Sequence, residues 1–114
     1  MKGSIARDGK TGPHVRVVQV AIATEKETEW NRWYDTIHVP AIAACPGYIS
    51  VRRFRSLNGE AKYMTIYEIE SPAATETKEF QQARGWGPFE TSVSDFVATT
   101  YEEISRYPVS DGEA

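Results

Sequence analysis

The pattern of hydrophobic and polar positions divides the chain into six expected elements between two polar ends. Val- and Ile-rich alternation predicts strands, whereas apolar residues at three- and four-residue spacing predict helices. We expect strands at residues 14–23, 49–55, 63–70 and 96–104, helices at residues 25–38 and 72–83, and a helical turn at 89–95. The order β-α-β-β-α-β predicts an α+β, ferredoxin-like fold, with a four-stranded antiparallel sheet and both helices on one face.

Local signals at the ends of the expected helices support these boundaries. Thr24, with Glu27 three residues later, predicts a capping box at the start of the first helix. Pro40 predicts that this helix ends two residues earlier, because proline disfavours helical geometry in the residue before it. Ser71 followed by Pro72 predicts the cap and the first residue of the second helix.

The second face of such a sheet would have no helices to cover it. Its strands include Val, Tyr and Phe side chains, which are costly to leave in water. Two copies packed face to face would cover each other and leave a cavity between them, so we expect a homodimer. The alternative is a monomer whose second face is half polar.

The composition of the chain adds limits to this picture. Its 114 residues, 40% of them hydrophobic, make a single domain, which we place at residues 14–107 between tails at 1–13 and 108–114. A net charge of -3 argues against a nucleic-acid partner. No apolar run is long enough to span a membrane. Cys45, the one cysteine, fits a reducing cytoplasm.

Residues 29–40, with the sequence EWNRWYDTIHVP, are the first candidate for chemistry. Trp30, Tyr34 and His38 follow one another at four-residue spacing and would share one helix face. A helix C-terminus favours a charged histidine, and an imidazole beside a phenol could shuttle a proton to a substrate. The alternative is structural: Trp30, Trp33 and Ile37 anchor the core, and His38 caps the chain or bonds a carbonyl.

The strand at residues 49–55 carries the second candidate. Alternation places Arg52 and Arg53 on opposite faces, so one guanidinium could reach a cavity and hold a carboxylate or an enolate. Tyr67 on the next strand could line the same cavity or simply pack. The alternative for the arginines is ion pairing at the surface with two acidic residues, Glu68 and Glu70.

Other patterns of catalytic or cofactor-binding residues are missing from the sequence. The two histidines, His14 and His38, and Cys45 show no spacing typical of a zinc or iron site. Residues 85–88 contain two glycines but lack the strand that precedes a phosphate-binding loop. We therefore expect neither a metal nor a cofactor.

The motif W-x-x-W-Y-D-x-x-H-V-P resembles the dimeric α/β-barrel superfamily, near its branch of ethyl tert-butyl ether degradation (EthD-like) and uncharacterised bacterial proteins. The residues that carry the likeness are Trp30, Trp33, Tyr34, Asp35, His38, Val39 and Pro40. Pro46-Gly47-Tyr48, the following arginines and Gly87-Pro88-Phe89 extend it over about residues 14–106. The resemblance implies a site between sheet and helices, with a histidine of the first helix contributing. The superfamily includes isomerases, cyclases, cofactor-free monooxygenases and haem enzymes.

The function that follows is proton-transfer chemistry without a cofactor, such as isomerisation, cyclisation or decarboxylation of an apolar, oxygenated, anionic small molecule. His38 would be the acid or base, with Tyr34 and Asp35 as helpers. An arginine, Arg52 or Arg53, would hold the negative charge of the substrate, and three aromatic residues would line the pocket: Tyr67, Trp30 and Trp86. The alternatives are a cofactor-free monooxygenase acting on a phenol or polyketide, and a non-catalytic or stress-associated dimer that only binds a ligand.

Overall fold

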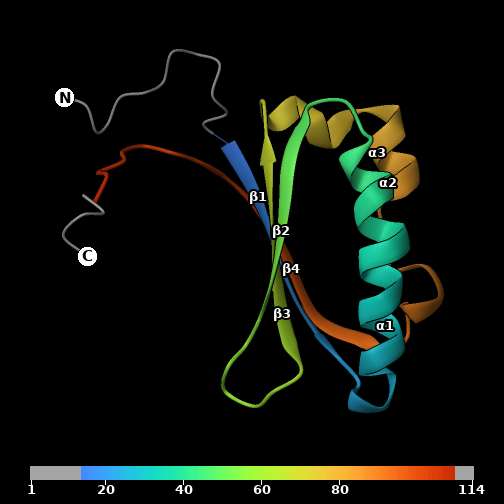
Figure 1. Ribbon diagram of the computed structural model, residues 1–114. Coiled ribbons are helices and arrows are strands. Elements are labelled where there is room, and N and C mark those ends of the chain that lie inside the picture. The colour runs from blue at the N-terminus through green and yellow to red at the C-terminus, as the bar shows by residue number, and fades with distance from the viewer. Residues whose placement is uncertain (1–13, 110–114) are drawn as a thin grey trace.

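Four strands form the sheet of this protein, and the computed structural model describes them within residues 14–109 (Figure 1). They are β1 (His14–Ile22), β2 (Tyr48–Arg55), β3 (Lys62–Ile69) and β4 (Val93–Glu102). All pairings are antiparallel, in the order β2-β3-β1-β4. The predicted ferredoxin-like α+β architecture is therefore confirmed. Residues 1–13 and 110–114, which hold most of the two predicted tails, lie outside the described residues.

The helices all lie on one face of the sheet, as Figure 1 shows. Alternate residues of β1 and β3 turn toward them and are buried: Val18, Val20, Ile22, Tyr63, Thr65, Tyr67 and Ile69. These residues meet the side chains of the first helical segment, above all Trp30, which is fully buried. The period-two alternation of the strands thus defines the core face.

The first helical segment continues beyond the predicted end at His38, so that prediction was wrong. It comprises η1 (Thr24–Lys26), α1 (Glu27–Trp33), the π-helical turn η2 (Tyr34–His38) and α2 (Val39–Ala43). Pro40 has no amide hydrogen and cannot donate a helical hydrogen bond. The amide of the residue before it, Val39, donates to the Tyr34 carbonyl, five residues back, which is the π-helical pattern. One wider, π-helical turn therefore accommodates the proline, and the helix continues beyond it.

The predicted capping box does not form. Thr24 is already inside η1, and neither η1 nor α1 has a side-chain cap at its start. The Glu27 carboxylate instead accepts a hydrogen bond from the Tyr63 hydroxyl at 2.5 Å. Glu27 therefore bonds a side chain of the sheet rather than the backbone at the start of its own helix.

The second predicted helix is divided in two. Ser71 caps a 3-10 turn, η3 (Pro72–Glu76), through the amide of Ala73, and the backbone is extended again at Thr77. Thr77 then caps α3 (Lys78–Ala83) through the amide of Phe80 at 3.0 Å. The helical turn expected at 89–95 is only η4 (Gly87–Phe89), and β4 begins earlier than predicted.

The other face of the sheet, which we call the open face, has no helix over it. Its apolar side chains come from all four strands: Val15, Val17, Phe54, Met64, Ile66, Val97 and Tyr101. Val97 and Tyr101 are each 53% exposed. In Figure 1 the segment that follows β4 leaves the sheet on this side.

Within residues 14–109, no helix is long and apolar enough to cross a membrane.

Candidate functional site

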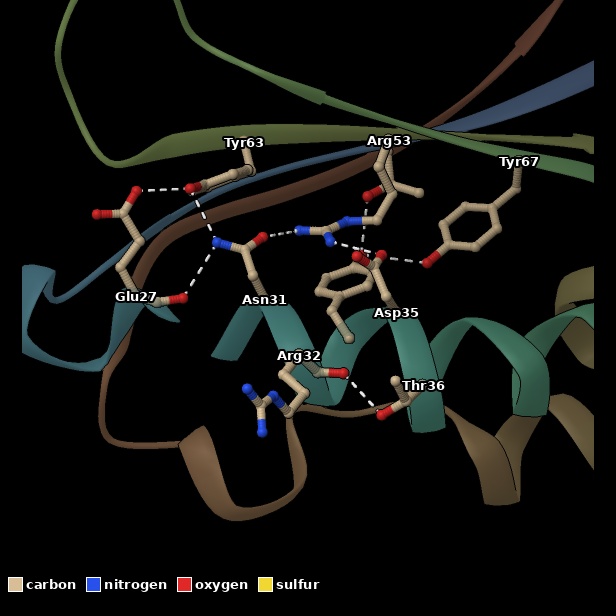
Figure 2. A network of polar contacts seen from close by, with 10 residues as sticks. Glu27, Asn31, Arg32, Asp35, Thr36, Arg53, Tyr63 and Tyr67 are labelled. Carbon is tan, nitrogen blue, oxygen red and sulfur yellow. Dashed lines mark hydrogen bonds and ion pairs between the residues drawn. The ribbon is translucent and has the colours of Figure 1, made fainter. Parts of the chain in front are cut away.

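Arg53 is the centre of a polar network that joins β2 to α1 (Figure 2). Its two terminal nitrogens donate at 2.7 Å each, one to Asp35 Oδ1 and the other to Asn31 Oδ1. Asn31 in turn donates to the Tyr63 hydroxyl at 2.9 Å and to the Glu27 carbonyl at 3.1 Å. The Arg53 guanidinium also lies over the Tyr34 ring, 4.0 Å from its centroid. This network pairs both terminal nitrogens of Arg53 with α1 and the turn after it, whereas Arg53 Nε is buried without a partner among residues 14–109.

The π-helical turn brings Tyr34 and His38 to the same side of the helix, one turn apart. Both side chains are buried, Tyr34 at 1% and His38 at 7% exposure. Ile37, between them, is 58% exposed, so its predicted role as a core anchor was wrong. The widened turn keeps the Tyr34 and His38 rings in contact, edge to face with centroids 5.0 Å apart.

Aromatic side chains hold the His38 imidazole in place. Trp33 stacks on it at 4.9 Å, and Trp86 lies at 6.1 Å. The Trp33 indole packs directly against the backbone of Gly87, where an added Cβ would lie 2.9 Å from the indole. Among residues 14–109 the imidazole has no hydrogen-bond partner, so the alternative in which it caps the chain or bonds a carbonyl was wrong.

The pKa of His38 is lowered to about 4, chiefly because burial disfavours the charged ring and secondly because Arg53 is nearby. This reverses the expectation that a helix C-terminus favours the charged form. That expectation depended on the helix ending at His38, which it does not. At neutral pH the imidazole is therefore uncharged and able to accept a proton.

Three hydroxyl groups meet beside the histidine. The Tyr34 hydroxyl lies 2.9 Å from Thr65 Oγ1 and 3.2 Å from the Tyr67 hydroxyl. Burial, together with the neighbouring Tyr34, raises the pKa of Tyr67 above its ordinary value. Tyr67 is therefore a neutral phenol at neutral pH, able both to donate and to accept a hydrogen bond.

A cavity of about 240 Å³ opens next to these groups, between the sheet and the helices. Tyr34, His38, Tyr67 and Trp86 line it, so the structure brings four of the predicted site residues together. Two arginines that sequence reasoning missed, Arg16 and Arg84, also line it. The cavity combines an uncharged base, phenol hydroxyls, cations and aromatic walls.

The other predicted site residues lie away from the cavity lining. Asp35 is 62% exposed and faces Arg53, and Trp30 is enclosed beneath the same network. Arg52 is on the open face, with its guanidinium 5.3 Å from the Phe54 ring centroid. The alternative pairing of the arginines with Glu68 and Glu70 was wrong, because no ion pair among residues 14–109 joins them and Arg53 turns toward Asp35.

Arg16 could have been found from the sequence, because it alternates with Val18 and Val20 along the first strand. It therefore shares their helix-facing side. Arg84 had no such signal, since its position depends on how the chain leaves α3.

A larger cavity, of about 450 Å³, lies at one end of the open face. Its lining includes Gln19, Phe54, Arg55, Lys62 and Asp95 but none of the predicted catalytic side chains. We favour the smaller cavity because a desolvated imidazole and hydroxyl groups converge there. No group of three or more His, Cys, Asp or Glu side chains within residues 14–109 could hold a metal ion.

Comparison with known proteins identifies relatives in structure only. No family model and no curated protein matches the chain. A Deinococcus radiodurans protein, suggested to be an antibiotic biosynthesis monooxygenase, superimposes with a TM-score of 0.67 and 13% identity over 85% of this chain and 98% of that one. An EthD-family protein from Bacillus halodurans gives 0.61 and 13% over 79% and 98%. The heme-degrader MhuD from Mycobacterium tuberculosis, with two hemes in its active site, gives 0.61 and 15% over 81% and 96%. These likenesses confirm the predicted ferredoxin-like fold of the single chain.

Proposed function

We propose that the 240 Å³ cavity is the active site of an enzyme that moves protons on a small, apolar, oxygenated acid, and that His38 is its general base. The observation that supports this most is the buried, uncharged imidazole with no hydrogen-bond partner among the described residues, open to a cavity. Such a nitrogen is free to take a proton from a carbon or oxygen of a bound molecule. A developing anion beside the imidazolium would strengthen the base during transfer.

The hydroxyl cluster would stabilise the oxygen on which negative charge develops. Tyr34 and Tyr67 both line the cavity and bond one another at 3.2 Å. A neutral phenol can turn its proton toward a substrate oxygen, and this bond strengthens as the oxygen becomes an enolate. Isomerisation, cyclisation and decarboxylation all pass through such an anion.

Asp35 and Arg53 would act through Tyr34 rather than on the substrate. Asp35 accepts from the Arg53 guanidinium, whose central carbon lies over the Tyr34 ring, 4.0 Å from its centroid. This arrangement fixes the ring and places a positive charge above it. We assign both as positioning residues, together with Trp30 beneath them.

The test combines a ligand screen with product analysis. Wild type and His38→Ala are screened by thermal shift against phenolic, lactone and polyketide-like acids, and every ligand that stabilises the protein is analysed after incubation. We expect conversion by wild type and a loss of 10²-fold or more in His38→Ala, the usual contribution of a general base. Ile37→Ala, an exposed change on the same turn, is the control and keeps full turnover. Unchanged turnover in His38→Ala would rule out the mechanism.

The second candidate is a cofactor-free monooxygenase, which is favoured by the fold shared with a suggested antibiotic biosynthesis monooxygenase. After His38 removes a proton, the carbanion would reduce O₂. A substrate methylene then becomes a carbonyl, with one oxygen atom in the product and the other in water. Consumption of one O₂ per product favours this candidate, whereas turnover without oxygen favours an isomerase or lyase. A ligand recovered chemically intact from both wild type and His38→Ala favours the alternative of a non-catalytic protein that only binds a ligand.

We further propose that two copies of this chain associate through the open face. Its apolar side chains come from all four strands, and Val17 lies on the central strand β1, between Ile66 and Thr99 of its two neighbours. Sedimentation velocity is expected to give twice the mass of the chain for wild type and the single mass for Val17→Glu. Arg32→Glu, on the opposite side of the molecule, leaves the dimer intact. A monomeric wild type would contradict the proposal.

We propose the cytoplasm as the location of the protein. Cys45 is the one cysteine of the sequence, and it is a free, buried thiol whose pKa is raised, mainly by desolvation. A protein that needs no disulfide suits a reducing compartment. Cell fractionation with an epitope-tagged chain tests this, and recovery from a membrane or secreted fraction would contradict it.

A further inference from the structure

We infer that Arg16 and Arg84 form an anion subsite in this cavity, and that the ligand they select is a small aromatic carboxylate. The inference rests on the proposed function, because it concerns the same cavity, and it adds the chemical class of the ligand. It also transfers the role first predicted for Arg52 or Arg53 to two other arginines.

Arg16 enters the cavity from the sheet. It lies on β1 opposite Tyr67 of β3 and Thr100 of β4, on the side that faces the helices. Its guanidinium lies over the Phe80 ring, 5.1 Å from the centroid. Among the described residues it has no ion-pair partner. The ring holds the planar group in place while its donors remain available for a carboxylate.

Arg84 enters from the opposite wall, at the end of α3. It is exposed, and no residue between 14 and 109 forms an ion pair with it. Glu90 lines the same cavity but accepts from the Trp86 amide at 3.4 Å rather than from an arginine. Two cations and one carboxylate give this cavity a positive balance that a bound anion would neutralise.

The size and the walls of the cavity define the rest of the ligand. A volume of about 240 Å³ equals that of roughly eight water molecules in the liquid, which suits one ring with its substituents. Phe80, Trp86 and Phe96 provide aromatic walls in the same cavity as the arginines and His38. A ring carrying a carboxylate would therefore place its acid group on the arginines and a second oxygen near His38 and Tyr34.

Matched acids and amides separate charge recognition from simple packing. Benzoate and benzamide, and salicylate and salicylamide, are titrated into the full chain by calorimetry, with quenching of tryptophan fluorescence as a second readout. For wild type we expect the acids to bind at least tenfold more tightly than the amides. Arg16→Gln and Arg84→Gln should each weaken binding of the acids about tenfold and leave the amides unchanged, since bonds to a charged group contribute this much.

Arg32→Gln is the control, because Arg32 is exposed on α1 and turned away from the sheet (Figure 2). It should bind both acids like wild type. Arg84→Gln changes an exposed side chain, so it tests the subsite even where Arg16→Gln unfolds. Equal affinity for acids and amides, no binding of any probe by wild type, or unchanged acid binding in Arg84→Gln and a folded Arg16→Gln overturns the subsite.

His38→Ala distinguishes failure of this subsite from failure of the proposed function. The variant should still prefer acids over amides, because both arginines are intact. Acid selectivity without any turnover supports the subsite and contradicts the general base. Turnover of neutral molecules that needs His38, without selectivity for acids, supports the general base and contradicts the subsite.

Discussion

Two polar clusters lie between the same sheet and the same helical segment, and they differ in whether their terminal polar groups are paired within the protein or face a cavity. Around Arg53, the terminal donors meet Asp35 and Asn31 at 2.7 Å, and Asn31 is bonded in turn. Around His38, the imidazole has no partner in the described part of the chain, and Arg16 beside the same cavity has no ion pair there. We call the first cluster closed because these terminal nitrogens of Arg53 are paired, although its Nε is buried without a partner within residues 14–109, and the second open because its groups line a cavity.

Structural and functional groups of the same chemical type can be distinguished by whether they are paired within the protein. Buried polar groups are costly without partners, so pairing the terminal nitrogens of Arg53 stabilises the fold and takes these donors away from any ligand. An open cluster gives up this stabilisation and keeps its donors and acceptors for another molecule. Arginine, tyrosine and a titratable group occur in both clusters, so residue type alone does not distinguish them.

The largest expected effect comes from breaking the closed cluster. Arg53→Ala removes two charge-assisted hydrogen bonds and the stem packed on aromatic rings, from a side chain that is only 15% exposed. We expect the free energy of unfolding to fall by about 3 kcal/mol. Urea unfolding measures this, with Arg32→Ala as the matched control at about 0.5 kcal/mol or less. Equal losses in the two variants would show that the network is not structural.

The open cluster should reveal itself through pH. The pKa of His38 is about 4 in the folded protein and about 6.5 when unfolded, so the unfolded state binds more protons between these values. Stability is therefore full above pH 6.5 and is lost as the pH falls toward 4, by about 2 kcal/mol between pH 7 and pH 5. Unfolding of wild type and His38→Gln at both pH values isolates this contribution. An identical pH dependence in the two proteins would contradict the desolvated histidine.

A smaller effect is expected where the two clusters meet. Tyr67→Phe removes one hydroxyl that bonds Tyr34 at 3.2 Å but leaves the 2.9 Å bond between Tyr34 and Thr65. We expect a loss of about 1 kcal/mol in unfolding free energy. The His38-dependent pH effect should persist, because Tyr67 is not among its causes. A loss above about 3 kcal/mol would show that the hydroxyl cluster belongs to the closed network.

The smallest effect is expected from Asp35→Asn. The carboxylate is 62% exposed, and the asparagine oxygen can still accept from Arg53. Exposed ion pairs contribute little, so we expect about 0.5 kcal/mol in urea unfolding, and less at high salt. A loss as large as that of Arg53→Ala would mean that the ion pair, rather than the buried arginine, holds the network together.

The positions of most strands and of the pair Tyr34 and His38 could be predicted from the spacing of residues along the chain. The strands at 14–23, 49–55 and 63–70 were predicted to within two residues, because alternation records which face is buried. Tyr34 and His38 were predicted on one helix face, and they are. The errors concern local signals that tertiary contacts overrode: Glu27 bonded to Tyr63 instead of capping, and the helix widened at Pro40 instead of ending.

The order of the elements, the buried face of each strand and the pair Tyr34 and His38 could be predicted, because they depend on spacing along the chain. Which arginine pairs with an acid, and which is left facing a cavity, depends on tertiary packing. Arg53 and Arg16 are alike in sequence terms, since each lies two residues from a valine on its strand, Val51 and Val18 respectively. Their difference depends on which helix lies opposite: α1 offers Asn31, with Asp35 one turn further on, whereas α3 offers Phe80 and a cavity.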